Sequence, residues 1–299
     1  MLVDRRLPLR YIVSKIWLDL LLLALSGTLI EVAVVRGAGL LPEVDPSVAA
    51  FLGTSISLIL SFKLAQSYQR WWEARKIWGA IVNDSRSLTR QVLTLVSADG
   101  RPEVERIAHR QIAWCYALGQ SLRGLDWRVG SEGHLEAPDI AEAEAHANRP
   151  LVMLQQHARD ITSLYHRGAL TDFQRLSLDE MLTRLTDSMG KAERIKSTVF
   201  PTTYRLYLHL FIYVFLIALA LSLAKTEGWK EVVVIFVIAI PFFLLERTAT
   251  LLQDPFENRP TDCAVTAIAR TIETNILQLL GAPSHALPAA PQDDDFYVL

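Results

Sequence analysis

The 299-residue sequence is poor in charged residues, in net charge and in cysteine. Charged residues make up 21% of the chain against 51% hydrophobic residues, and this balance is unusual for a water-soluble domain. The formal charge of −2 gives no global reason to expect DNA or RNA as a partner. The two cysteines, Cys115 and Cys263, fit no metal-binding or redox spacing, so we interpret both as buried apolar residues.

Motifs of enzyme sites are also missing. The seven histidines form no His-Glu-x-x-His pattern, no Gly-x-Ser-x-Gly segment occurs, and no glycine-rich phosphate loop follows a strand. A convincing alternation of polar and apolar residues, the pattern of strands, is lacking as well. The sequence therefore predicts an all-α protein that is not an enzyme and needs no cofactor.

Hydrophobic residues are concentrated in four runs. These runs are residues 16–35, 48–62, 206–224 and 232–245. The first is long enough to cross a bilayer core of about 30 Å as a helix. The second is short, but its helical pattern continues without proline or glycine as far as Trp78, which predicts one long helix that leaves the membrane.

Lysine and arginine cluster before the first run, after the second and before the third. This bias assigns both termini and the middle of the chain to the cytoplasm, in a multi-pass protein of the inner (plasma) membrane. The expected segments are a cytosolic start (1–15), spans one and two (16–62), a cytosolic helical region (63–200), spans three and four (201–247) and a cytosolic C-terminal helix and tail (248–299).

Apolar residues at helical spacing predict the cytosolic helices. Their expected ranges are about 80–98, 101–124, 150–167 and 172–197, with residues 129–148 as a connecting loop. The tail after Leu280 (281–299) is expected to lie as an extended segment on the cytosolic surface of its own subunit or of a neighbour, with residues 296–299 docked in a groove.

Three ionisable residues lie within the apolar runs: Asp19, Glu31 and His209. Glu31 and His209 suggest a proton relay. The alternative is that Glu31 simply reaches the membrane interface.

Span two carries two neighbouring stripes with a repeat of four residues. The first comprises Thr54, Leu58 and Phe62; the second, of small residues, comprises Gly53, Ser57 and Ser61. A largely apolar stripe beside a stripe of small residues suits a helix packed around an axis. Ordinary packing within the membrane explains the same spacing, and spacing alone leaves both interpretations open.

Below these stripes, the segment LSFKLAQSYQRWWEARKIWGAIVNDSR (60–86) strongly resembles the bestrophin signature, in which a pore helix runs into an Arg-Trp-Trp segment. DPFENRPTD (254–262) resembles the segment that follows the last span in the same family, and RYIVSKIW (10–17) and residues 190–201 fit too. The resemblance implies a bestrophin-like homopentameric channel, with four transmembrane helices per chain and a large cytosolic helical region.

The resemblance also implies where the pore is narrow. Thr54, Leu58 and Phe62 take the positions of a hydrophobic neck. Phe173 takes the position of a cytosolic aperture, with Leu170 and Leu176 as near alternatives.

Animal bestrophins also have a calcium clasp, which this sequence retains only in part. Leu251 stands at the glutamine position, Asp254 at the asparagine position, and Glu257 and Asp262 are the remnants of the acidic run. Because calcium takes about six to eight oxygen ligands, we expect no calcium activation and no bound metal.

The sequence leaves open whether the channel conducts anions or cations, because the family includes anion channels and its prokaryotic members include cation channels. Lys63 below the neck favours anions unless it points away into a salt bridge. Glu73 favours cations unless it pairs with Arg70 or Lys76.

We expect a passive channel for small monovalent ions in a lipid bilayer, chloride or other anions, or sodium or other cations. A proton-coupled transporter or a membrane-anchored sensor is the alternative.

Overall fold

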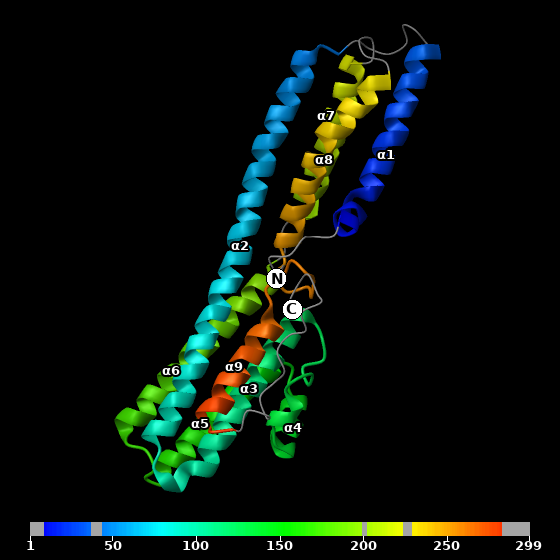
Figure 1. Cartoon of the computed structure of the whole chain (residues 1–299). Helices are drawn as coiled ribbons and strands as arrows, with labels where there is room; N and C mark the ends of the chain where they lie inside the picture. Colours follow the sequence, from blue (N-terminus) through cyan, green and yellow to red (C-terminus); the bar gives the residue numbers. More distant parts are fainter. Residues whose placement is uncertain (1–8, 37–43, 199–201, 224–228, 283–299) are drawn as a thin grey trace. The chain divides into compact units, whose positions relative to one another are not determined.

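The computed structural model describes residues 9–36, 44–198, 202–223 and 229–282 of the chain. Within these ranges every regular element is a helix, which confirms the all-α prediction (Figure 1). The elements are α1 (Leu9–Arg36), α2 (Pro46–Leu95), η1 (Ala98–Gly100), α3 (Arg101–Arg123), η2 (Glu132–His134), α4 (Ala137–Glu144), α5 (Arg149–His166), α6 (Asp172–Ser197), α7 (Thr202–Leu223), α8 (Trp229–Leu252) and α9 (Val265–Leu279).

The chain divides into two compact units. The described part of the first, here called the span unit, comprises residues 9–36, 44–71, 202–223 and 229–254. That of the second, here called the polar unit, comprises residues 72–198 and 255–282. The expected spans two and four end at residues 62 and 247. The span unit continues as far as residues 71 and 254, and α2 and α8 continue as helices beyond their apolar runs.

The span unit contains α1, the first part of α2, α7 and α8. Among the described residues, four helices are long and apolar enough to cross a bilayer, in agreement with the four predicted runs. Helix α8 packs against both α1 and α7. The core of the unit includes Ile56 and Leu60 of α2, Ile212 of α7 and Phe243 of α8.

Helix α2 is one uninterrupted helix from Pro46 to Leu95 (Figure 1). The expectation that a separate helix begins near residue 80 is therefore wrong. A single glycine, Gly79, costs a helix only about 1 kcal/mol relative to alanine. Trp78 and Ile81 on either side of it are completely buried, and their packing outweighs this cost.

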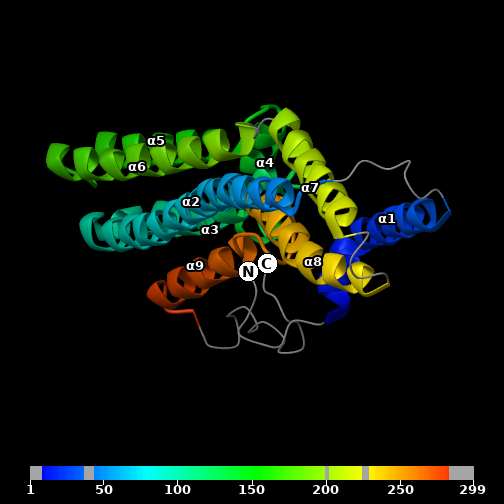
Figure 2. The same cartoon turned by 90° about the horizontal axis from the view of Figure 1, so that it is seen from above.

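In the polar unit, α3 packs against α5 and α9, and α5 packs against α4 and α6. The predicted helices 101–124, 150–167 and 172–197 are confirmed as α3, α5 and α6, and α5 and α6 run alongside each other in Figure 2. Helix α6 begins at a capping box, in which the side chains of Thr171 and Gln174 bond each other's backbone N–H groups. Helix α3 ends at Gly124, whose φ of 68° suits a residue without a side chain.

The expected loop 129–148 is in part helical, which corrects that prediction. It contains η2 and α4, and Ala143 of α4 is fully buried. The segment is rich in alanine, which has the highest helix propensity. Asp139 of α4 also binds Arg110 of α3 at 2.7 Å, and this contact holds the short helix on the core.

Candidate functional site

The two faces of α2 differ within the span unit. The side chains of Leu58 and Phe62 are 59% and 61% exposed in the single chain, and Thr54 on the same stripe is exposed too. Ile56 and Leu60 are almost completely buried. The stripe of Thr54, Leu58 and Phe62 is therefore not part of the chain's own core, so packing within one subunit does not explain it.

The stripe of small residues is divided between these faces. Gly53 lies against Phe215 of α7, and a Cβ atom at Gly53 would approach Cε2 of that ring to 3.0 Å. The hydroxyl of Ser57 is exposed and donates to the carbonyl oxygen of Gly53 at 2.8 Å. Thr54 donates in the same way to Ala50 at 2.9 Å, so these polar groups are satisfied within their own helix.

Lys63 follows Phe62 in sequence but does not share its exposed face. Its side chain is completely buried, and its Nζ atom lies 2.8 Å from Oε1 of Glu246 and 3.1 Å from Oγ1 of Thr250. Of the two alternatives for Lys63, the structure thus shows the salt bridge. The sequence did not single out Glu246, because it lies just beyond the fourth apolar run.

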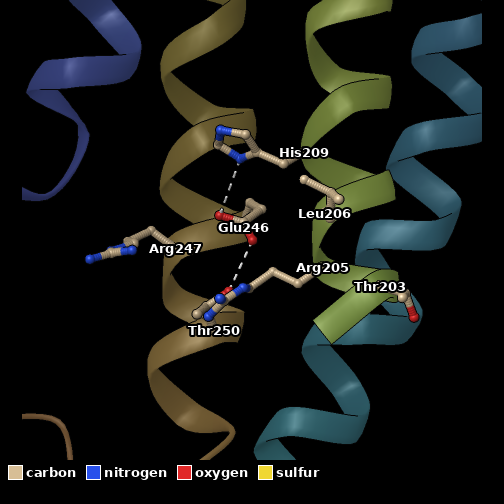
Figure 3. A pocket seen from close by; sticks show the side chains of 7 residues that line it. All are labelled: Thr203, Arg205, Leu206, His209, Glu246, Arg247 and Thr250. Carbon is tan, nitrogen blue, oxygen red and sulfur yellow. Dashed lines mark hydrogen bonds and ion pairs between the residues drawn. The ribbon is translucent and has the colours of Figure 1, made fainter. Parts of the chain in front are cut away.

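A polar cluster extends from this salt bridge across the span unit. His209 Nε2 lies 3.1 Å from Oδ1 of Asp19, to which the Tyr213 hydroxyl donates at 3.0 Å. His209 Nδ1 lies 3.9 Å from Oε2 of Glu246 (Figure 3). The expected partner of His209 was Glu31, whose side chain lies outside the described part of the structure. The partner observed is Asp19, so α1, α2, α7 and α8 all contribute to one network.

Glu73 belongs to the part of α2 in the polar unit and is half exposed. Its Oε1 atom lies 3.4 Å from Nη2 of Arg194 in α6. The structure thus shows an ion pair for Glu73, but with Arg194 rather than with Arg70 or Lys76. Arg70 instead donates to the carbonyl oxygen of Gln253. No short-range pattern points to Arg194, because the contact joins residues far apart in the chain.

The three candidates for the cytosolic aperture differ in exposure. Phe173, in the first turn of α6, has 85% of its surface exposed, and Leu176 has 55%. Leu170 is buried in the core of the polar unit. The structure thus removes Leu170 as an alternative, because a residue inside the core of its own subunit does not line an opening.

The residues at the clasp positions close a loop between α8 and α9. Asp262 is buried, and its Oδ2 atom accepts hydrogen bonds from the backbone N–H groups of Glu257 at 2.6 Å and Arg259 at 3.0 Å. Glu257 is also ion-paired with Arg259. Asp254 belongs to the span unit. In the described ranges, no group of three or more His, Cys, Asp or Glu side chains is placed to hold a metal ion.

The polar unit contains a buried charge cluster that sequence reasoning missed. Arg110 is buried and binds Asp139 and Asp160, each at 2.7 Å, and Arg106 binds Asp160 at 2.6 Å. Burial would raise the pKa of Asp160, but the two guanidinium groups outweigh it and lower that pKa. Burial, together with the charge of Arg110, lowers the pKa of His157 to about 3.

The cysteines are buried and unpaired, as predicted. Burial raises the pKa of the Cys115 thiol to about 12, so the reactive thiolate is scarce at neutral pH.

The sequence profile of the family described as "Bacterial/Fungal Bestrophin protein" matches residues 9–278. The chain belongs to the bestrophin family. It is 30% identical over 240 residues to a voltage-dependent anion channel-forming protein of Ralstonia nicotianae, with 79% of this chain and 77% of that protein covered. It is also 30% identical over 233 residues to the protein of the same description, YneE, from Escherichia coli K12, with 77% and 75% covered.

Solved bestrophin structures share the fold. The crystal structure of a bacterial bestrophin homologue from Klebsiella pneumoniae superposes with a TM-score of 0.84 at 26% sequence identity, covering 90% of this chain and 99% of that one. The matched residues include parts of both units. The bestrophin resemblance predicted from the signature segments is therefore confirmed, and the chain is a membrane protein of a channel family.

Proposed function

We propose that this bestrophin is one subunit of a passive ion channel formed by five identical chains around an axis. The exposed apolar stripe of Leu58 and Phe62 is the observation that carries the proposal. Five-fold symmetry places five copies of each exposed residue in a ring around the axis. In such a ring this face of α2 lines the centre of the assembly and does not contact lipid. Thr54, Leu58 and Phe62 then form the neck, and Phe173 lines the cytosolic aperture.

The conducted species in this proposal is a small monovalent anion such as chloride. The relatives in Ralstonia and Escherichia coli bear the description of anion channel-forming proteins, which favours this sign. Lys63 supplies no free charge below the neck, and the ion pair with Arg194 weakens the attraction of Glu73 for cations. The rings of the neck are uncharged. In this channel they therefore set the energy barrier that an ion must cross, and charges outside the neck determine whether anions or cations pass.

The proposed orientation places both termini and the polar unit in the cytoplasm of the cell, with the four spans in the inner membrane. The basic residues that flank the spans support it. Cleavage of the polar unit by protease added outside vesicles or cells tests the orientation. In inside-out vesicles the polar unit should be cleaved, whereas in right-side-out cells it should be protected.

The decisive experiment is a recording from purified protein in a planar bilayer with asymmetric NaCl. We expect discrete steps of current that reverse near the Nernst potential of chloride. A reversal near the sodium potential would contradict the anion assignment, and an absence of steps under every gradient would contradict a pore. Native mass spectrometry in detergent tests the stoichiometry, for which a dominant dimer or tetramer would be the contrary result.

A proton-coupled transporter is a second candidate, because His209 and Asp19 bring titratable groups together inside the span unit. Such groups form proton relays in transporters. This function predicts solute uptake into liposomes that depends on a pH gradient and is lost in His209→Gln. Channel steps that persist in His209→Gln without a pH gradient favour the channel.

A further inference from the structure

One cavity of the span unit is used by neither the neck nor the aperture. It has a volume of about 510 Å³, within the usual range of ligand pockets, and opens between the start of α7 and the end of α8 (Figure 3). The residues that line it are Thr203, Arg205, Leu206, His209, Glu246, Arg247 and Thr250.

The charges around this cavity do not cancel. Glu246 is the only acidic residue of the lining, and Lys63 already neutralises it at 2.8 Å. Arg205 on α7 and Arg247 on α8 are both exposed, and neither has an ion-pair partner within the described residues. Arg205 and Arg247 therefore bring two uncompensated positive charges to the lining; in Figure 3 the Arg205 side chain points toward Thr250 and that of Arg247 points away from it.

The cavity lies at the ends of two spans. Thr203 begins the apolar stretch of α7, and Thr250 lies in the last turn of α8, whose apolar stretch ends at Leu252. Residues at the end of a span lie at the depth of lipid headgroups. Basic pockets between membrane helices are suited to anionic headgroups, and the planar guanidinium group binds phosphate through two parallel hydrogen bonds.

We propose that Arg205 and Arg247 bind a phosphate group in this cavity, carried by an anionic phospholipid or by a soluble phosphate. The guanidinium group of Arg205 holds the phosphate oxygens, and the exposed side chain of Arg247 rotates to join it when phosphate binds. Thr203 lines the same opening. Glu246 stays paired with Lys63 and so does not repel the anion with a free charge. The site is separate from the exposed stripe of α2 and does not depend on the proposed channel function.

The test measures phosphate binding by the full-length protein purified in detergent. Native mass spectrometry follows the binding of phosphatidylglycerol and of phosphatidylcholine with the same acyl chains. In a second arm, thermal unfolding is followed with increasing inorganic phosphate at constant ionic strength. The site variant is Arg205→Gln with Arg247→Gln. The control is Arg90→Gln with Lys191→Gln, which removes two exposed positive charges from the polar unit.

We expect saturable binding of phosphatidylglycerol over phosphatidylcholine that weakens about 30-fold in the site variant and stays unchanged in the control. If phosphatidylglycerol shows no preference but inorganic phosphate stabilises the wild type and not the site variant, the phosphate is soluble. Equal binding of both lipids without any effect of phosphate would overturn the proposal. A site variant that folds and binds like the control would overturn it as well.

Discussion

Lys63 and Glu246 form a salt bridge of 2.8 Å between α2 and α8, and their side chains are 0% and 7% exposed. Removing two charges from water is expensive, and their attraction offsets this cost only while both are present. The pair also fixes the direction of the Lys63 side chain, toward α8. Its role is therefore expected in the stability of the span unit and not in the attraction of ions.

Lys63→Met should destabilise the protein by about 3–5 kcal/mol, because it leaves the carboxylate of Glu246 buried without its cation. Thermal unfolding in detergent and gel filtration measure the loss. Lys63→Met combined with Glu246→Leu should recover much of it, and Lys76→Met, an exposed position on the same helix, serves as the control. If folded Lys63→Met channels showed a changed reversal potential, Lys63 would act on ions directly.

Leu58→Ala should raise the conductance or the open probability, because a wider apolar ring costs an entering ion less dehydration. Leu60→Ala is the matched control on the buried face of the same helix. It should leave conduction unchanged and cost about 2–5 kcal/mol of stability through the cavity that it creates. Single-channel recordings with gel filtration of each variant distinguish the two effects. Well-folded Leu58→Ala channels with wild-type conductance would disprove the neck.

His157→Leu should stabilise the polar unit, and more so at acidic pH. The ring of His157 is fully buried with no hydrogen-bond partner in the described residues, and its pKa is lowered to about 3. In the unfolded chain the pKa is about 6.5. Below that pH the unfolded state binds a proton that the folded state does not, so stability falls as the pH falls from about 6.5 to 3.

The gain from His157→Leu should therefore be larger at pH 5 than at pH 7.5, by about 2 kcal/mol. Unfolding temperatures at the two pH values measure this difference. The control is His166→Leu, which changes an exposed histidine at the end of the same helix. An equal gain in stability at both pH values would mean that protonation of His157 does not contribute to the pH dependence of stability.

Gly130→Ala should destabilise more than Gly124→Ala, although both glycines have a positive φ. A Cβ atom at Gly130 would lie 2.6 Å from Cδ1 of the Tyr116 ring, whereas at Gly124 it would meet no atom within 4 Å. Gly124→Ala should cost only the stability that a residue with a Cβ atom loses in the left-handed backbone conformation, about 1–2 kcal/mol. Unfolding temperatures of the two variants compare these costs. Equal shifts would show that the Tyr116 ring moves aside freely.

The spans and the exposed stripe of α2 could be predicted from the sequence because both depend on local spacing. Apolar runs give the spans, and a repeat of four places Thr54, Leu58 and Phe62 on one face of any helix. The partners of charged residues depend instead on contacts between distant segments. The pairing of Glu73 with Arg194, and of His209 with Asp19, joins helices that no short-range pattern connects.

Two errors of the sequence-based prediction had the same origin. The helix start expected near residue 80 and the loop expected over residues 129–148 both rest on local sequence alone. In both places burial decided the outcome, since Trp78, Ile81 and Ala143 are all completely enclosed by other helices. Local preferences of about 1 kcal/mol are too weak to predict such segments when tertiary contacts act against them.

The packing of α9 on α3 sets the order in which parts of the chain can fold during its synthesis. Helix α9 supplies Ile272 and Ile276 to the core that Ile107 and Ile112 of α3 also form, yet α9 is made after all four spans. Until the ribosome has passed Leu279, the apolar face of α3 has no cover and is open to aggregation or to chaperones. Completion of the polar unit is therefore a late event that follows the translation of all four spans.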